Sequence, residues 1–524
     1  MRREAILQRL TARREPWDLA VIGGGATGAG IALDAAARGY SVALFEQSDF
    51  GKGTSSRSTK LIHGGVRYLR QGNVALVRDS LRERGLLMWN APHVVHGLEF
   101  IIPNYAWWEA PFYGLGMKVY DWLAGRLSLG PSQVLSREEV LKRVPTLSAK
   151  ALRGGVKYHD AQFDDTRLLI NLVQTAVEWG AMALNYARVT ALIKDGRGLI
   201  SGLSFRDEES GTIHEVTARV VINATGPFCD GVRRIDEPAA PSMIEPSQGV
   251  HLVFGREFLP GDAAILVPRT RDGRVMFAIP WHGHTLVGTT DTAIPEVTLE
   301  PVPLENEIQF LLETASAYLA KKPSRADILS VFTGIRPLVK TGEKLGTSAL
   351  ARDHTIAVSP SGLLTIAGGK WTTYRKMAED AVTRAARLAR LEARESVTWN
   401  LRIHGHGDTG HPLDVMNVYG SDKVEIERLK QQDPGLAITL HPALTICGAQ
   451  VIWAARHEFA RTVEDVLARR TRALFLNAAA ALAMAPEVAR LLAAELGRDA
   501  GWQEAQVESF RVTAETFLPP RSCQ

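Results

Sequence analysis

The stretch WDLAVIGGGATG, residues 17–28, decides the fold, because an apolar run breaks directly into a cluster of glycines. Such a break is typical of a buried parallel strand that turns straight into a helix. In this geometry Gly23 makes the tight turn, Gly25 lets the backbone approach a pyrophosphate, and Gly28 permits close packing of the helix on the strand. The glycines alone are a weak signal, so the residues around them carry the interpretation.

The residues that follow complete a strand–helix–strand unit in the expected order. A helical pattern with Ile31, Leu33 and alanines 35–37 leads into a second apolar strand that ends at Glu46. An acid at this place accepts a hydrogen bond from a ribose hydroxyl. The unit therefore predicts a dinucleotide site, without distinguishing NAD from FAD. The predicted contacts are Gly23, Gly25, Ala26, Thr27, Gly28 and Glu46.

Length, charge and cysteine content restrict the class of protein. A chain of 524 residues exceeds what one hydrophobic core usually supports, so two or three domains are expected. The net charge of +4 is small for this length, which argues against a nucleic-acid partner. Three widely separated cysteines predict neither a disulfide framework nor a zinc site. The histidine-rich residues 404–411 are interpreted as a polar linker, and no metal site is predicted.

The second strand is followed by a loop rich in Gly, Ser and Thr, residues 48–69. This composition is typical of a loop wrapped around a ligand, with a solvated surface loop as the alternative. A helix is predicted from Arg167 to Trp179, with a cap at residues 164–166.

Strand ends of the nucleotide-binding kind recur far along the chain. One is Asn223-Ala224-Thr225-Gly226, and another is the strand-to-helix turn Gly368-Gly369-Lys370. One sheet is therefore expected to be assembled from separated segments, an arrangement that favours FAD over NAD. We predict an α/β fold with three parts. They are a discontinuous Rossmann-like FAD-binding domain (17–90, 155–245 and 345–398), a β-rich cap and substrate domain (91–154 and 246–344), and a C-terminal helical domain (399–524).

Six segments resemble, in the same order, motifs of the FAD-dependent glycerol-3-phosphate dehydrogenase family. They are residues 21–28, 54–68, 222–228, 288–291, 334–338 and 368–375. Residues 460–472 are similar to the helical domain of that family. Several motifs look more like the aerobic, mitochondrial branch, although no D-x-D-x-D-G calcium loop follows residue 400.

The resemblance implies that sn-glycerol 3-phosphate is oxidised to dihydroxyacetone phosphate by hydride transfer to flavin N5, with electrons passed to a membrane quinone. Such chemistry needs a base, a group that places the carbon over the ring, and a phosphate site. The alternatives within the fold are a glycerol-phosphate oxidase that uses oxygen, a dehydrogenase of another polyol phosphate such as erythritol phosphate, and an amine or amino-acid oxidase. A flavin-containing nucleic-acid-binding factor is the alternative from a different class.

The family motifs also imply which residues contact the cofactor beyond the glycine turn. Hydroxyls and backbone amides of the polar loop suit the pyrophosphate and the edge of the ring. These residues are Thr54, Ser55, Ser56, Ser58, Lys60, Leu61, His63, Gly64 and Gly65 in the loop, and Ala224, Thr225, Gly226, Gly369, Lys370 and Thr372 at the later strand ends.

A dianionic phosphate is best held by planar guanidinium groups that donate two hydrogen bonds. For each arginine taken alone, a surface ion pair is the alternative. Arg57 stands where other branches of the family carry a small residue, and it is assigned no role. The substrate contacts implied by the motifs are Arg67, Tyr68, Arg336, Arg352 and Lys370.

The catalytic candidates are His251, Arg336, Lys370 and His63. His251 matches a family histidine near the substrate, and an imidazole with an ordinary pKa near 6.5 accepts a proton at neutral pH. A structural histidine is the alternative reading of this residue. His63 is the second candidate for the base, and is expected to orient rather than abstract. Lys370 follows two glycines at a helix start, where positive charge stabilises a reduced ring.

Quinone reduction requires contact with a bilayer. Residues 105–127 combine Trp and Tyr with Lys118 and Arg126, which suits an interfacial surface, while packing between cap and flavin domain is the alternative. The basic N-terminus, with Ile6 and Leu10 at helical spacing, is expected to add electrostatic attachment or to fray in solvent. We expect a peripheral protein on the cytoplasmic side of the inner (plasma) membrane, or a cytoplasmic one if unattached. A homodimer is left open.

Overall fold

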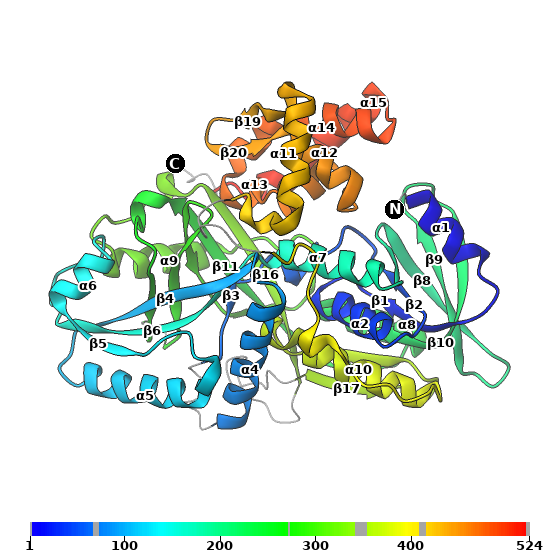
Figure 1. The fold of residues 1–524 in the computed structure, drawn as a ribbon, viewed down its shortest axis with the longest axis horizontal. Helices are drawn as coiled ribbons and strands as arrows, with labels where there is room; N and C mark the ends of the chain where they lie inside the picture. Colours follow the sequence, from blue (N-terminus) through cyan, green and yellow to red (C-terminus); the bar gives the residue numbers. More distant parts are fainter. Residues whose placement is uncertain (1–2, 66–72, 271–272, 341–353, 408–414, 520–524) are drawn as a thin grey trace.

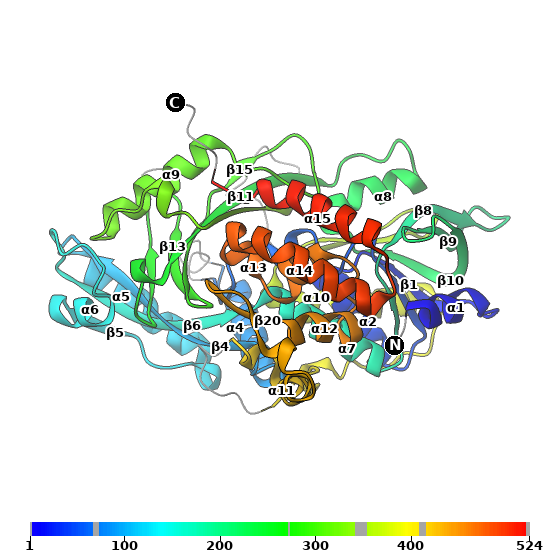
Figure 2. The same ribbon diagram turned by 90° about the horizontal axis from the view of Figure 1, so that it is seen from above.

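The computed structural model describes residues 3–65, 73–270, 273–340, 354–407 and 415–519. Two large sheets lie side by side, with the C-terminal helices packed across them (Figures 1 and 2). The α/β fold with a C-terminal helical region is confirmed. Within the described residues, no helix combines the length and the apolar character needed to cross a membrane.

Among the described residues, the first sheet has eight strands and is built from three separated parts of the chain. β1 lies between β2 and β10, all parallel, and β18 extends the sheet beyond β10. Because apolar clusters cover both faces of the sheet at this strand, β1 is an almost continuous buried apolar run. The strands are β1 (Trp17–Ile22), β2 (Val42–Phe45), β7 (Met182–Leu184), β8 (Ala187–Lys194), β9 (Ile200–Asp207), β10 (Ile213–Asn223), β17 (His354–Val358) and β18 (Leu364–Gly368).

Three helices pack side by side on this sheet, with α2 between the other two. Gly30 lets α2 approach α10, since a Cβ there would lie 2.9 Å from the ring of Tyr374. The helix predicted from Arg167 begins two residues earlier, and Asp164 caps it by accepting from the backbone N–H of Arg167 at 2.9 Å. The helices are α2 (Ala26–Ala37), α7 (Asp165–Glu178) and α10 (Tyr374–Leu388), and α8 (Cys229–Asp236) follows β10.

Over the ranges that the structure describes, the second sheet has ten strands, and it carries the cap. Its most extensive pairings are β4 with β6 and β11 with β16, both antiparallel. The strands are β3 (Leu61–Ile62), β4 (Val95–Asn104), β5 (Gln133–Ser136), β6 (Gly154–Phe163), β11 (Ile244–Gly255), β12 (Ala264–Val267), β13 (Met276–Trp281), β14 (His284–Gly288), β15 (Thr292–Ala293) and β16 (Ser330–Val339). Helices α4 (Val74–Asn90), α5 (Glu109–Ala124), α6 (Arg137–Arg143) and α9 (Glu305–Tyr318) surround it.

One stretch lies in a different sheet from the one expected. Residues 155–163, assigned from sequence to the FAD-binding domain, form most of β6 and pair along their length with β4. Pairing with β4 places them in the second sheet, and β3 adds residues of the polar loop to the same edge. The other domain boundaries stay predictions.

The C-terminal helices share a continuous apolar core with the cap sheet. A π-helix, Asp465–Arg470, precedes the short helix α13. The elements of this region are α11 (Lys423–Gln432), the hairpin β19 (Thr439–His441) and β20 (Leu444–Cys447), α12 (Gly448–His457), α13 (Ala473–Leu476), α14 (Ala478–Leu496) and α15 (Ala500–Glu515).

The N-terminal helix α1 (Arg3–Ala12) is docked, contrary to both readings of its sequence. Ile6 and Leu10 are buried in an apolar cluster on the first sheet. Arg3 forms a buried ion pair with Asp207 at 2.5 Å. The apolar face of α1 therefore neither frays nor faces a bilayer.

Candidate active site

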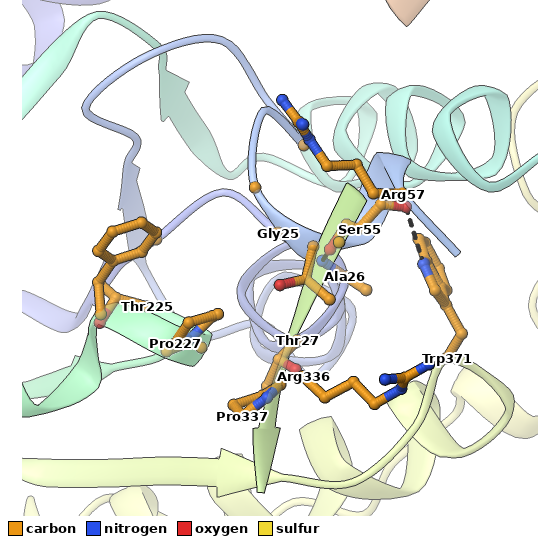
Figure 3. A pocket seen from close by; sticks show the side chains of 18 of the residues that line it. Gly25, Ala26, Thr27, Ser55, Arg57, Thr225, Pro227, Arg336, Pro337 and Trp371 are labelled. Carbon is orange, nitrogen blue, oxygen red and sulfur yellow. Dashed lines mark hydrogen bonds between the residues drawn. The ribbon is translucent and has the colours of Figure 1, made fainter. Parts of the chain in front are cut away.

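A cavity of about 380 Å³ opens where the first sheet meets the cap. Its floor is formed by the carboxyl ends of parallel strands β1, β2, β10 and β18, which is where open α/β sheets bind ligands. Its roof comes from β11 and β16 of the cap, through residues that include Gly249, His251 and Arg336. Figure 3 shows side chains from these distant parts of the sequence around one space.

The glycine turn has the close packing that the sequence predicts. Gly23 has a φ of 106°, which favours glycine, and a Cβ there would lie 2.7 Å from the carbonyl oxygen of Ala224. A Cβ at Gly28 would lie 1.8 Å from the carbonyl oxygen of Gly23. Gly28 therefore allows the helix to pack closely against the turn, and it does not line the cavity.

Glu46 stands at the end of β2 and lines the cavity. Its carboxylate accepts hydrogen bonds from the backbone N–H of Gly24 at 2.7 Å and of Ser48 at 2.9 Å. Burial raises the pKa of this carboxyl above its ordinary value, an effect that the two backbone donors partly offset. The acid is thus fixed to the glycine turn, beside the place where a nucleotide ribose would lie.

The polar loop lies along the cavity and is held there by hydrogen bonds to other elements. Its 3₁₀ turn, Thr54–Ser56, is tied to three elements. The hydroxyl of Ser55 accepts from Ala26 N–H at 2.9 Å, and its carbonyl accepts from Trp371 Nε1 at 3.0 Å (Figure 3). The Thr54 hydroxyl donates to the Ile335 carbonyl at 2.6 Å. The loop therefore joins the start of α2, the start of α10 and strand β16.

Most of the predicted cofactor contacts gather around the cavity. Those that line it are Gly23, Gly25, Ala26, Thr27, Glu46, Thr54, Ser55, Ser58, Leu61, His63, Ala224, Thr225, Gly226, Gly369, Lys370 and Thr372. Gly28, Ser56, Lys60, Gly64 and Gly65 are not among the lining residues. The ammonium of Lys60 is buried behind the loop, where it donates to Asp165 at 2.6 Å, and the Gly64 N–H donates to the Tyr120 hydroxyl of the cap at 2.8 Å. Arg67, Tyr68 and Arg352 lie outside the described residues.

His251 lines the cavity from β11. Its Nε2 lies 2.9 Å from the hydroxyl of Thr59, and its ring stacks on Phe332 with centroids 4.7 Å apart. Its Nδ1 has no hydrogen-bond partner within the described chain. Burial, with the nearby charges of Lys60 and Arg336, lowers the pKa of this imidazole well below 6.5. The ring is therefore neutral at neutral pH.

Arg336 projects from β16 and lines the same cavity. Its guanidinium donates to the carbonyls of Gln248 at 3.2 Å and Thr290 at 3.0 Å, and to the Thr289 hydroxyl at 3.2 Å. Asp291 lies 3.4 Å away as an ion-pair partner. The motif at residues 288–291 therefore serves to fix the direction of this arginine.

Arg57, to which no role is assigned from sequence, lies in the cavity wall. Its guanidinium is mostly buried, pairs with Glu300 at 2.5 Å and donates to the Thr333 carbonyl at 3.2 Å. No local signal links Arg57 with an acid 243 positions later. Trp371, which is not among the predicted contacts, also lines the cavity, directly after the predicted Gly-Gly-Lys turn.

The fold and this site define a dinucleotide-binding oxidoreductase with a substrate cap. The family model described as FAD dependent oxidoreductase matches residues 18–375, and that of the C-terminal domain of alpha-glycerophosphate oxidase matches residues 364–506. The chain belongs to the FAD-dependent oxidoreductase family, in the branch that contains the glycerol-3-phosphate dehydrogenases.

Named relatives cover nearly the whole chain. A probable mitochondrial glycerol-3-phosphate dehydrogenase of Caenorhabditis elegans is 41% identical over 540 residues, which is 97% of this chain and 74% of the relative. A mitochondrial glycerol-3-phosphate dehydrogenase of Arabidopsis thaliana is 40% identical, over 97% of this chain and 88% of the relative. The crystal structure of the glycerol-3-phosphate dehydrogenase from Bacillus halodurans complexed with FAD has a TM-score of 0.80 and 29% identity, covering 99% of this chain and 98% of that one.

FAD is therefore the cofactor, and the described residues fit it. The glycine turn leaves no room for a Cβ at Gly23 or Gly28, as the tight turn and the close helix packing of a dinucleotide-binding motif require. Glu46 supplies the ribose acceptor, and the polar loop supplies hydroxyls along the same wall. Trp371, His63 and His251 line the same cavity.

Proposed function

We propose that this enzyme oxidises sn-glycerol 3-phosphate to dihydroxyacetone phosphate and passes the electrons to a membrane quinone. One observation carries the proposal. His251 and Arg336 stand on the paired strands β11 and β16 and line the cavity that holds the glycine turn. A neutral base and a fixed guanidinium are thus brought to the same cofactor site, which suits the oxidation of an alcohol that bears a phosphate.

Arg336 is the described residue best placed to hold the phosphate. Its four polar partners fix the guanidinium before any ligand arrives, so little side-chain entropy is lost on binding. Lys370 lines the same cavity and adds positive charge. Arg67, Tyr68 and Arg352 are proposed as further substrate contacts on the strength of their motifs alone.

His251 is proposed as the base that takes the proton of the substrate hydroxyl. The charge of Arg336 contributes to the low pKa of this imidazole. A phosphate dianion bound at Arg336 offsets that charge, so the pKa of His251 rises when the substrate is present. Bound FAD supplies the two-electron acceptor for the hydride that leaves the carbon. His63 is proposed to orient the substrate rather than to abstract a proton.

The exposed face of α5 supports contact with the membrane that holds the quinone. Its buried residues pack against the cap, but a stripe of apolar side chains faces solvent, with exposed fractions between 40% and 78%. The stripe consists of Trp108, Phe112, Leu115, Val119 and Trp122. The aromatic side chains of this stripe face solvent and do not pack between the cap and the flavin domain. The alternative interpretation of residues 105–127 is therefore wrong for these side chains. A tryptophan-rich stripe on one helix face suits the bilayer interface.

The test is reduction of the bound flavin under anaerobic conditions. Purified protein is mixed with glycerol 3-phosphate, with a longer polyol phosphate and with an amino acid, and the flavin absorbance is followed. Bleaching by glycerol 3-phosphate alone, or fastest with it, supports the proposal. Bleaching only by another substrate overturns it. Reoxidation of the reduced protein by a short-chain quinone rather than by oxygen then identifies a dehydrogenase and rejects an oxidase.

A further inference from the structure

Two cations converge on one backbone carbonyl behind the cofactor cavity. The carbonyl of Ser56 accepts from Lys60 Nζ at 2.7 Å and from the guanidinium of Arg472 at 2.9 Å. The carboxylate of Asp165 lies between the same two cations, 2.6 Å from Lys60 and 3.3 Å from Arg472. All three ionic side chains are nearly or completely buried. Arg472 belongs to the C-terminal helical region, more than 400 positions after the loop that it contacts.

The loop around Ser56 has one side that lines the cavity and a rear side that faces away from it. Thr54, Ser55, Arg57, Ser58, Thr59 and Leu61 line the cavity, whereas Ser56 and Lys60 do not. Asp165 also accepts from the N–H and hydroxyl of Ser58, at 3.1 and 2.7 Å. The contacts on the rear side therefore determine where Thr59 stands. Thr59 in turn holds Nε2 of His251.

A second path leads from Arg472 to the same imidazole. The guanidinium lies over the ring of Phe475 at 4.1 Å. Phe475 packs on Phe332 with centroids 4.9 Å apart, and Phe332 stacks on His251 at 4.7 Å. Arg472 is thus connected to both the ring face and the Nε2 edge of His251.

The backbone at both ends of this cluster is unusual. Lys60 and Arg472 have φ values of 62° and 64°, a left-handed conformation that is uncommon for residues other than glycine. The π-helix Asp465–Arg470 ends two residues before Arg472. Strained backbone of this kind persists where surrounding contacts impose it, and it concentrates at functional sites.

We propose that Arg472 is a positioning residue for the active site, acting through Ser56, Asp165 and Phe475 to hold Thr59 and Phe332 against His251. The C-terminal helical region then forms part of the catalytic unit. Its arginine sets the orientation of an imidazole that it does not touch. The role in turnover rests on the proposed function of His251 as the base.

The test compares Arg472→Lys with the matched control Arg167→Lys. Arg167 is equally buried at the same junction, where it pairs with Glu458 and donates to the carbonyl of Arg470 at 2.8 Å. Within the described part of the chain, its side chain makes no hydrogen bond, ion pair or ring contact with residues 54–61 or with Phe332. The fork of a guanidinium cannot be replaced by one ammonium, so both variants lose buried hydrogen bonds. Only Arg472→Lys is expected to slow anaerobic flavin reduction, by about 10- to 100-fold, with little change in the affinity for glycerol 3-phosphate.

A second measurement does not depend on turnover. The imidazole nitrogen signals of ¹⁵N-labelled histidine, assigned with His251→Gln, are expected to move in Arg472→Lys and to stay in Arg167→Lys. Equal effects of the two variants on the reduction rate and on this signal would overturn the proposal. If glycerol 3-phosphate does not reduce even the wild-type flavin, the proposed function fails, while the histidine signal still decides the positioning role.

A milder substitution serves as a control in case Arg472→Lys destabilises the fold. Thr166→Val removes the hydrogen bond of 2.6 Å from Arg472 to the Thr166 hydroxyl and leaves every charge in place. If Arg472→Lys does not fold, Thr166→Val is expected to show the same shift of the His251 signal in smaller measure, and an unchanged signal contradicts the inference. Combining it with Thr59→Ala is expected to be non-additive, because both changes act on the same imidazole contact.

Discussion

Gly249 and Arg336 are in close contact, because a Cβ at residue 249 would lie 2.4 Å from Nη2 of the guanidinium. Gly249 is on β11, two residues before His251, and Arg336 is on the neighbouring strand β16. The guanidinium lies over the backbone of β11 and donates to the carbonyl of Gln248 at 3.2 Å. The absence of a side chain at residue 249 is therefore what allows the arginine to reach its place in the cavity.

Replacing Gly249 with alanine is expected to displace the guanidinium from the proposed phosphate site. We expect kcat/KM for glycerol 3-phosphate to fall by about tenfold or more, mainly through a higher KM, since phosphate binding is lost before chemistry. Steady-state kinetics with a quinone acceptor measures this. Gly231→Ala is the control, because a Cβ there meets nothing within 4 Å. An unchanged KM in Gly249→Ala would mean that Arg336 does not bind the phosphate.

Gly28→Ala is expected to prevent the glycine turn from closing. The added Cβ would lie 1.8 Å from the carbonyl oxygen of Gly23, so the turn or helix α2 must shift. We expect loss of FAD and a decrease of at least about 2 kcal/mol in the free energy of unfolding. The ratio of flavin to protein absorbance after gel filtration measures cofactor content. Gly196→Ala, in an open turn, is expected to keep its FAD, and equal retention by both variants contradicts the role given to Gly28.

Local geometry explains which parts of the site could be predicted from sequence. The roles of Gly23 and Glu46 follow from a single strand–helix–strand unit, because the contacts that define these roles lie inside that unit. The cap of α7 follows from residues 164–167 alone. In the irregular loop, no regular periodicity determines the direction in which each side chain points. Nothing in the order of Ser58, Thr59 and Lys60 tells which side chain faces the cavity, and Lys60 points away from it.

Contacts between distant segments explain the rest. Arg57 meets Glu300 and Arg472 meets Ser56 only after both sheets and the C-terminal region have assembled. The docking of α1 likewise depends on a buried acid, Asp207, at the end of β9. A charged, amphipathic N-terminal segment looks the same in sequence whether it lies on a membrane or on the protein itself.

Stability is expected to fall in acid because of His93. Burial lowers the pKa of this histidine from 6.5 to about 4, and its Nε2 lies 3.2 Å from Asn171. The unfolded chain binds this proton below about pH 6.5, but the folded protein binds it only below about pH 4. Stability present at neutral pH is therefore lost as the pH falls through this window, by about 1.4 kcal/mol per pH unit.

Urea unfolding at about pH 7.5 and at about pH 5.5, for wild type and His93→Gln, measures this contribution. The variant is expected to be less stable at the higher pH, since it loses packing, but to lose less stability on acidification than the wild type. An identical decrease in both proteins would assign the acid sensitivity to other groups.

Removing the apolar stripe of α5 is expected to release the protein from membranes. In the double variant Phe112→Ser with Trp122→Gln, two exposed aromatic side chains are lost while the buried residues Met117 and Tyr120 remain. Burial of one such side chain is worth about 1.5 to 3 kcal/mol, so the partition onto vesicles is expected to fall by at least about tenfold. Flotation with vesicles of phosphatidylglycerol and phosphatidylcholine measures the partition. Trp179→Gln, an exposed tryptophan at the end of α7, is the control and is expected to bind as the wild type does.

Because flavin reduction by substrate needs no bilayer, the double variant is expected to keep that rate and to lose only activity with membrane-bound quinone. Equal binding of the double variant and the wild type would show that α5 is not the membrane-contacting surface.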